Sequence, residues 1–250
     1  MKSTFKRIII VFGVILILLI IYLISYGIKA NTAMKRMTSI ETGEVINNIY
    51  AINDSYVNLF LIKGENKYVA VDGGNKIENV ELGLKTLGID SNDIIAIFLT
   101  HTDFDHVAAI DIFKNAIVYL SRSEEQMIND EHARFFSIAK NKISTSDYSV
   151  LDDEQIVIID GINIQGISNP GHTPGAMSYL INNSYLFTGD ALKLEDGRVT
   201  SFYEIFNMDS EIANTSINKL MALKGVEYLF TAHSGYSDNY NLLATQWTNK

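Results

Sequence analysis

Residues 94–106 read IIAIFLTHTDFDH, and this stretch decides how the rest of the chain is interpreted. Its apolar part, Ile94 to Leu99, predicts a buried strand. The polar part then places four potential metal ligands in six residues: His101, Asp103, Asp105 and His106. Alternate positions of an extended loop project the same way, so His101 and Asp103 are expected to share one metal ion. Asp105 and His106, at the start of the next helix, are expected to face a second ion.

Three further candidate ligands each follow a strand-like segment. They are His172 in NPGHTPG (169–175), Asp190 after LFTG (186–189), and His233 in TAHSG (231–235). Imidazole and carboxylate suit Zn, Mn or Fe, and a site with incomplete protein ligation keeps room for water. Cysteine is absent, which excludes a thiolate-bound zinc, a cysteine nucleophile and a disulfide framework.

The motifs HTDFDH, PGHTPG, LFTGDAL and TAHSG, in this order, resemble the metallo-β-lactamase superfamily. The resemblance covers about residues 45–235 and includes Asp72-Gly73-Gly74 at the strand end before the first helix of the body. It implies an α/β fold, a four-layer αβ/βα sandwich with its site at one edge. It also implies an enzyme that binds two divalent ions and uses a hydroxide bridging them. The bond hydrolysed would belong to an ester, thioester, lactone, amide or phosphodiester, and the sequence does not choose among these.

The same resemblance implies a role for each ligand. One ion would be held by His101, Asp103 and His172, the other by Asp105, His106 and His233, with Asp190 bridging the two. Asp105 would orient the hydroxide and Asp190 would set the spacing of the metals, which makes these two the predicted catalytic residues. Asp72 is expected to support a ligand rather than to bind metal.

Asp103 departs from the family pattern, because most hydrolases of the superfamily read HxHxDH and this chain reads HxDxDH. A carboxylate lowers the net charge of the site by one and favours Mn or Fe relative to Zn, which is otherwise the expected metal. One alternative is therefore a diiron redox protein similar to the oxygen and nitric oxide reductases, which carry Glu there and an attached flavin domain. This chain has no room for such a domain. Another alternative is a non-catalytic, metal-binding or degenerate member of the superfamily.

An N-terminal segment, residues 1–37, is expected to anchor the chain in a membrane. Residues 8–24 are unbroken apolar sequence, and with residues 25–27 they reach the length that a transmembrane helix needs. A cleaved signal peptide is the alternative, although the run is long and its cleavage site is poor. Basic residues lie on both sides of the run, with Lys2, Lys6 and Arg7 before it. These three residues favour a cytoplasmic N-terminus and a body outside the cytoplasm, that is, a single-pass protein of the cell membrane, whereas the basic residues after the run weaken this preference.

Residues 38–250 are expected to form one α/β catalytic domain. The formal net charge is −9, and because residues 1–37 contain six basic and no acidic residues, the body carries fourteen basic against twenty-nine acidic ones. This acidic charge argues against nucleic acid as a partner, so a small molecule is the expected substrate. The patterns predict strands at 44–50 and 57–61. They predict helices at 75–87, 107–113 and 123–142, and a helix capped by Asp209 or Ser210 that ends near Leu223.

Two further expectations concern single side chains. Phe202, Tyr203 and Phe206 follow Asp190 and are expected either to line a substrate pocket or to pack in the core. His132, in a polar stretch, is expected at the surface.

Overall fold

A computed structural model describes residues 2–129, 131–134 and 140–248. The chain divides into two compact units, Met1–Arg36 and Met37–Lys250. The first unit is the helix α1 (Lys2–Met34), of which Ile9–Met34 is long and apolar enough to cross a bilayer. Membrane anchors and signal sequences share these properties, so the helix is a candidate membrane span and does not by itself show which of the two it is.

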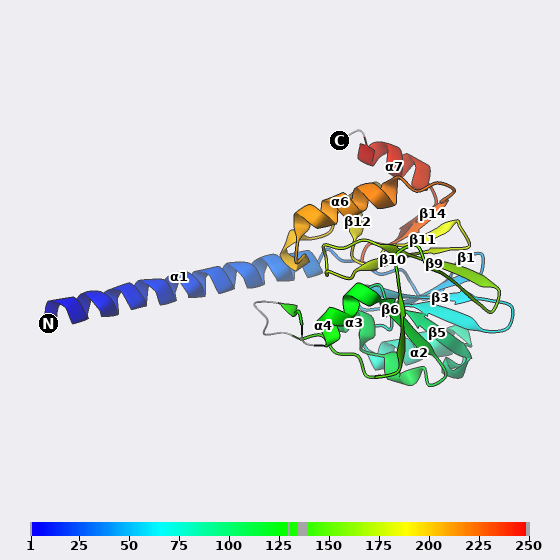
Figure 1. Cartoon of the computed structure of the whole chain (residues 1–250), viewed down its shortest axis with the longest axis horizontal. Helices are drawn as coiled ribbons and strands as arrows, with labels where there is room; N and C mark the ends of the chain where they lie inside the picture. Colours follow the sequence, from blue (N-terminus) through cyan, green and yellow to red (C-terminus); the bar gives the residue numbers. More distant parts are fainter. Residues whose placement is uncertain (1, 130, 135–139, 249–250) are drawn as a thin grey trace. The chain divides into compact units, whose positions relative to one another are not determined.

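The first sheet of the second unit has seven strands within the described residues, and they follow one another in chain order (Figure 1). The strands are β1 (Gly43–Ile46), β2 (Ile49–Asp54), β3 (Val57–Lys63), β4 (Tyr68–Val71), β5 (Ile94–Phe98), β6 (Ile117–Ser121) and β7 (Tyr148–Leu151). Strands β1 to β4 are antiparallel, and β4 to β7 are parallel. Parallel strands all end at the same edge, which is where the loop after β5 lies.

The second sheet runs in the order β15-β14-β11-β10-β9-β8, and a separate hairpin joins β12 to β13. The bounds are β8 (Ile156–Ile159), β9 (Ile162–Ser168), β10 (Met177–Ile181), β11 (Tyr185–Phe187), β12 (Leu192–Glu195), β13 (Arg198–Ser201), β14 (Tyr228–Phe230) and β15 (Tyr236–Ser237). Strands β11 and β14 are parallel, whereas the other neighbours are antiparallel.

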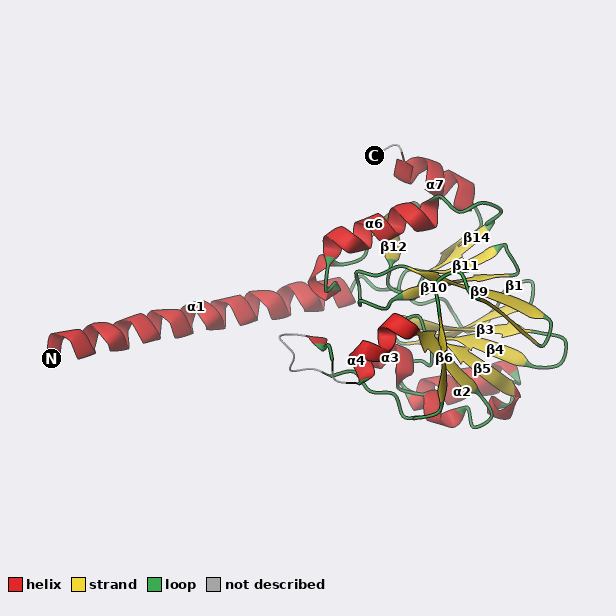
Figure 2. Ribbon diagram, in the orientation of Figure 1, coloured by secondary structure: helices red, strands yellow, loops and turns green. Residues whose placement is uncertain are grey.

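Helices cover the outer face of each sheet (Figure 2). On the first sheet lie α2 (Ile77–Leu87), α3 (Phe104–Val107) and α4 (Glu125–Ile128), with the 3-10 turns η1 (Ser91–Asp93), η2 (Ile110–Ile112) and η3 (Arg122–Glu124). On the second lie α6 (Ser210–Met221) and α7 (Tyr240–Thr248), and the 3-10 turn η4 (Glu204–Phe206) follows the hairpin. The result is the predicted four-layer αβ/βα sandwich.

Alternation along the strands explains why the layers form. In β3, Phe60 and Ile62 face the second sheet, whereas Leu59 and Leu61 face α2, and all four are buried. A strand buried on both faces reads as continuous apolar sequence, as VNLFLIK does from Val57. Removing each such side chain from water contributes about 1.5–3 kcal/mol.

Two predicted elements differ from the structure. The segment predicted as one strand at 44–50 is split between β1 and β2, because Asn47 and Asn48 adopt positive φ angles of 43° and 66° and form a turn. The helix predicted at 107–113 does not form: α3 ends at Val107 and is followed by the 3-10 turn η2. The amides of Ala108 and Ala109 donate to the carbonyls of Gly74 and Gly73, so they cannot continue a helical ladder.

Within its described residues, the polar stretch at 123–142 is less helical than predicted, because residues 129, 131–133 and 140–142 are not helical. Of its described residues, those at 125–128 form α4, and the structure does not describe residues 130 and 135–139. His132 is exposed, as expected. The predicted helix near the C-terminus is confirmed as α6, where the carboxylate of Asp209 accepts hydrogen bonds from the amides of Glu211 and Ile212.

Candidate metal centre

The seven predicted ligands come together from four segments. The segment after β5 supplies four of them, two from the loop and two from α3, and the loops after β9, β11 and β14 each supply one. Two sets of three donor atoms, each within 4.8 Å of one another, are found among the described residues. We call His101, His172 and Asp190 the first ligand group, and Asp105, His106 and His233 the second.

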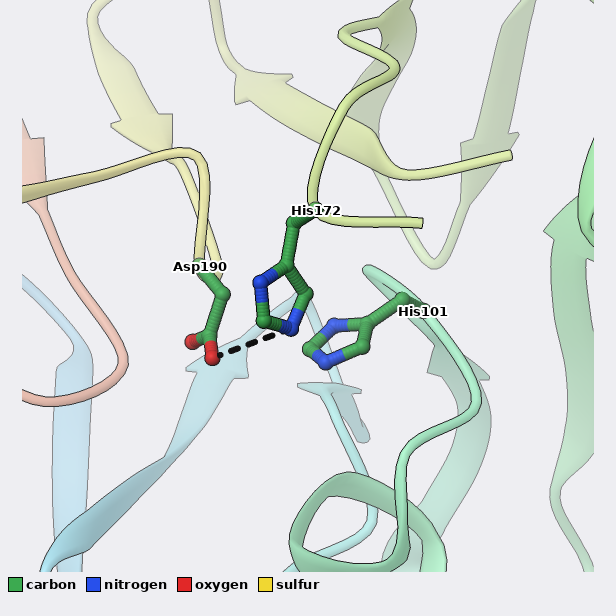
Figure 3. Close-up of side chains that lie close together, drawn as sticks. All are labelled: His101, His172 and Asp190. Carbon is green, nitrogen blue, oxygen red and sulfur yellow. Dashed lines mark ion pairs between the residues drawn. The ribbon is translucent and has the colours of Figure 1, made fainter. Parts of the chain in front are cut away.

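In the first ligand group the side chains of His172 and Asp190 converge on His101 (Figure 3). Nε2 of His172 lies 3.4 Å from Oδ2 of Asp190. The rings of His101 and His172 meet edge to face at 4.6 Å between centroids. Asp103 is outside this set of three, yet its Oδ2 lies 3.5 Å from Nε2 of His101 and 3.2 Å from Nε2 of His172.

The second ligand group is joined to the first through Asp190. Oδ1 of Asp190 lies 3.1 Å from Nε2 of His233 and 3.6 Å from Nε2 of His106. Asp105 contributes Oδ2 at 3.6 Å from Nε2 of His233. One oxygen of Asp190 therefore faces each ligand group, which is the arrangement that a bridging carboxylate requires.

Four buried atoms at this point have no well-directed hydrogen-bond partner within the described chain: Nε2 of His101, His106 and His233, and Oδ1 of Asp190. Leaving a buried polar atom unsatisfied costs about 1–3 kcal/mol, so four at one spot call for a ligand. Two atoms bound at about 2.1 Å to a tetrahedral ion lie about 3.4 Å apart. The separations of 3.1 to 3.6 Å around Asp190 match this spacing, and the residues fit divalent metal ions.

Each imidazole is oriented from behind through its Nδ1 atom. His106 donates to Oδ2 of Asp72 at 2.8 Å, and His233 donates to the carbonyl of Tyr56 at 2.7 Å. In the first ligand group the partners are neutral side chains: Oγ1 of Thr100 for His101 at 3.0 Å, and Oδ1 of Asn207 for His172 at 3.2 Å. With Nδ1 so engaged, Nε2 is the atom that faces the centre.

The pKa values of two imidazoles shift in opposite directions. Burial lowers the pKa of His106, but the carboxylates of Asp72, Asp105 and Asp190 outweigh it and raise the value to about 10. For His172, burial and the nearby charge of Arg134 lower the pKa to about 4. His172 is thus neutral and able to bind metal at neutral pH, whereas His106 must release a proton to do so.

Asp103 is held by two residues that sequence reasoning missed, Arg134 and Asn141. Nε and Nη2 of Arg134 both donate to the Asp103 carboxylate, and Nδ2 of Asn141 donates to its Oδ1 at 2.9 Å. Burial raises the pKa of Asp103, but the facing imidazoles of His101 and His172 and the charge of Arg134 hold it well below its ordinary value. The sequence signal that could have indicated Arg134 is the carboxylate at position 103, where most family members have His, because an additional buried carboxylate requires a cation.

Glu124 is a second missed residue, and it ties two ligand loops together. Its Oε1 accepts from the amide and hydroxyl of Thr102 at 2.8 and 2.7 Å, and its Oε2 accepts from the hydroxyl of Thr173 at 2.6 Å. The side chain is 1% exposed, and burial raises its pKa. Glu124 fixes the loops that carry His101 and His172 relative to each other.

Aromatic side chains form one wall of the centre. The buried ring of Phe202 lies 5.3 Å from His172 and 5.6 Å from His233, between centroids. Tyr203 and Phe206, both partly buried, pack against Phe202. The expected packing of these residues is confirmed, and Phe202 also borders two of the ligands.

Comparison with known proteins places these features in a family. The family profile described as "Metallo-beta-lactamase superfamily" matches residues 52–233. A probable metallo-hydrolase of Methanocaldococcus jannaschii is 30% identical over 169 residues, which cover 67% of this chain and 71% of the relative. A probable polyketide biosynthesis zinc-dependent hydrolase of Bacillus subtilis is 36% identical over 106 residues, or 41% of each chain.

Among solved structures, a B3 metallo-beta-lactamase with an active-site glutamic acid aligns with a TM-score of 0.67 at 19% identity. The alignment covers 88% of this chain and 92% of that protein. At this level of identity the likeness establishes the fold.

Proposed function

This chain belongs to the metallo-beta-lactamase superfamily and has the fold of its metallo-hydrolases, and we propose that it hydrolyses an uncharged carboxylic ester, thioester or lactone of small size. The observation that carries the proposal is the set of four buried, unsatisfied donor atoms of His101, His106, His233 and Asp190. Such atoms are stable in a folded protein when a ligand satisfies them. Seven ligands, one of them the bridging carboxylate of Asp190, support two ions, and zinc is favoured because a relative is named as zinc-dependent.

Bound divalent ions would supply an acidified water as nucleophile and would polarise the carbonyl under attack. The chain's own residues then have separate roles. Asp190 would hold the two ligand groups at a fixed separation, since one of its oxygens faces each group. Asp105, with Oδ2 3.6 Å from His233, would accept a proton from the attacking water and orient it.

The surroundings of the centre favour an acyl substrate over a phosphodiester. Phe202, Tyr203 and Phe206 offer an apolar wall against which an acyl chain or ring can pack. Among the described residues, two cations near this wall are paired with carboxylates: Arg134 with Asp103, and Lys193, above the ring of Tyr203, with Glu195. A phosphodiester anion is bound best where cationic side chains are available to it, which is not the case for this pair.

The proposal is tested with the full chain in detergent, using an aryl ester, an acyl thioester, an acyl lactone and an aryl phosphodiester. We expect turnover of at least one acyl substrate, its loss after treatment with a chelator, and its return with Zn or Mn. Faster turnover of the phosphodiester would contradict the substrate class. Absence of chelator-sensitive turnover of all four would support the degenerate, non-catalytic alternative.

We also propose that α1 is retained as a membrane anchor with the body outside the cytoplasm. The support is its length, its apolar composition and the basic residues before it. Protease added to intact cells should remove the body, whereas a body protected until the cells are opened would reverse the orientation.

A further inference from the structure

Among the Lys and Arg ion pairs of the described body, the pair of Asp103 and Arg134 is the most buried, and it contacts the ligands. The side chain of Arg134 is 9% exposed and that of Asp103 is 21% exposed. The guanidinium engages both carboxylate oxygens, with Nε 3.0 Å from Oδ1, while Nη1 donates to the carbonyl of Phe206 at 2.6 Å. This two-point contact fixes the plane of the carboxylate as well as its position.

The same carboxylate also faces the first ligand group. Its Oδ2 lies 3.2 Å from Nε2 of His172 and 3.5 Å from Nε2 of His101. These separations bracket the roughly 3.4 Å between two ligands of one tetrahedral ion. Asp103 is therefore placed to bind metal through Oδ2, which Nη2 of Arg134 also contacts, while Nε of Arg134 and Nδ2 of Asn141 hold Oδ1.

Charge explains why Arg134 accompanies Asp103. A neutral imidazole at position 103 would add no charge to the centre, whereas Asp103 adds one negative charge and Arg134 adds one positive charge. The pair thus has the same net charge as the imidazole. Without the guanidinium, the buried carboxylate would be unneutralised whenever metal is absent, and it would be free to rotate away from His101 and His172.

We propose that Arg134 is a positioning residue for the metal centre: it holds Asp103 as a ligand of the ion bound by His101 and His172 and cancels its charge. The inference rests on the proposed function in one respect, namely that the centre binds metal. It adds that positions 103 and 134 act as one unit, so that each substitution is harmful alone and much less so in combination.

The test measures zinc affinity by chelator competition, and zinc per chain by elemental mass spectrometry, on the full chain in detergent. R134Q should weaken the binding of one ion by about tenfold or more and leave the other unchanged, because loss of an outer partner costs about 10–100-fold in affinity. R134K should recover part of the loss, since it restores the charge without the two-point contact.

D103H should also lose affinity for that ion, because it leaves a buried, unpaired guanidinium beside the metal. The double variant D103H/R134Q should then bind the ion more tightly than either single variant. R122Q is the matched control, since Arg122 makes the same kind of contact with Asp152, at 2.8 Å from Nε, but on the surface. It should leave both affinities unchanged.

Unchanged affinity in R134Q would overturn the inference, as would a double variant whose loss is the sum of the two single losses. In either case a wild-type protein that binds two ions would leave the proposed function standing. A wild-type protein that binds no zinc, manganese or iron would overturn both. Thermal unfolding of the metal-free variants shows whether any loss of affinity arises from a failure to fold.

Discussion

The two ligand groups of the centre are built differently, although they share Asp190. In the second group, His106 is backed by the carboxylate of Asp72 and His233 by a backbone carbonyl, both within 2.8 Å. In the first group, His101 and His172 are backed by a hydroxyl and an amide at 3.0 and 3.2 Å. A charged or backbone partner orients an imidazole more firmly than a neutral side chain does.

The difference shows how the tasks are divided. The second group is held by residues next to the strands, because Asp72 directly follows β4 and Tyr56 lies in the turn between β2 and β3. The first group depends on side chains from more distant loops, including Glu124, Arg134 and Asn207. We therefore expect the second group to hold its ion more tightly and the first group to be more sensitive to changes around it.

The largest expected effect comes from the residue that both groups share. D190A removes the carboxylate between them, so hydrolysis should fall by about 1000-fold or more and both ions should bind more weakly. Steady-state kinetics and elemental analysis measure these two outcomes. H132A is the control, because this histidine is exposed and should be dispensable. Full activity in D190A would show that the groups do not act together.

A smaller effect is expected when the second group loses its charged backing. D72N keeps the shape of the side chain but removes the charge that accepts from His106 at 2.8 Å. Affinity for the more tightly bound ion should fall by about 10–100-fold, as measured by chelator competition. An effect confined to the weaker ion would mean that the two groups have been ranked in the wrong order.

A still smaller effect is expected in the first group from N207A. Oδ1 of Asn207 accepts from His172 at 3.2 Å, and this longer, uncharged contact contributes less orientation. Affinity for the weaker ion should fall by less than about tenfold. The same titration provides the measurement, and a loss larger than that of D72N would remove the proposed contrast.

The smallest expected effect is the change in the free energy of unfolding of the metal-free protein per pH unit. The two ligand groups should change this free energy in opposite directions as the pH changes. The pKa of His106 is raised to about 10, so its stabilisation is complete below pH 6.5 and is lost as pH rises toward 10. The pKa of His172 is lowered to about 4, so its stabilisation is present above pH 6.5 and is lost as pH falls toward 4. Each group contributes at most about 1.4 kcal/mol per pH unit.

Denaturant unfolding of the metal-free chain at a series of pH values tests this contrast. H106Q should flatten the alkaline decline, and H172Q should flatten the acid decline. An acid decline that depends on His106 instead would contradict the assigned directions.

Much of this arrangement can be read from the sequence, because the ligands follow strands. Apolar runs such as Ile94 to Leu99 predict strands, and the motifs at their ends predict which side chains meet at the edge of the sandwich. The break after Val107 could not be predicted, since it depends on hydrogen bonds from Ala108 and Ala109 to a loop more than thirty residues earlier in the chain.

Residues that support the ligands were harder to find. Glu124 and Arg134 lie in a polar stretch whose periodicity resembles that of a solvated helix, and their partners are 22 and 31 residues away. Only the tertiary fold brings them to the ligand loops. Asp103 itself could be singled out from the sequence, because it departs from the family pattern. The sequence did not reveal that Arg134 is the cation that neutralises it.

The central claim, that these two groups form one dinuclear centre, is tested most directly by the metal content of the purified chain. The full chain is produced in medium containing Zn, Mn and Fe together, purified in detergent, and measured by elemental mass spectrometry. We predict about two Zn or Mn ions per chain. Two Fe ions would instead favour the diiron redox alternative, and less than about half an ion of any metal would contradict the claim.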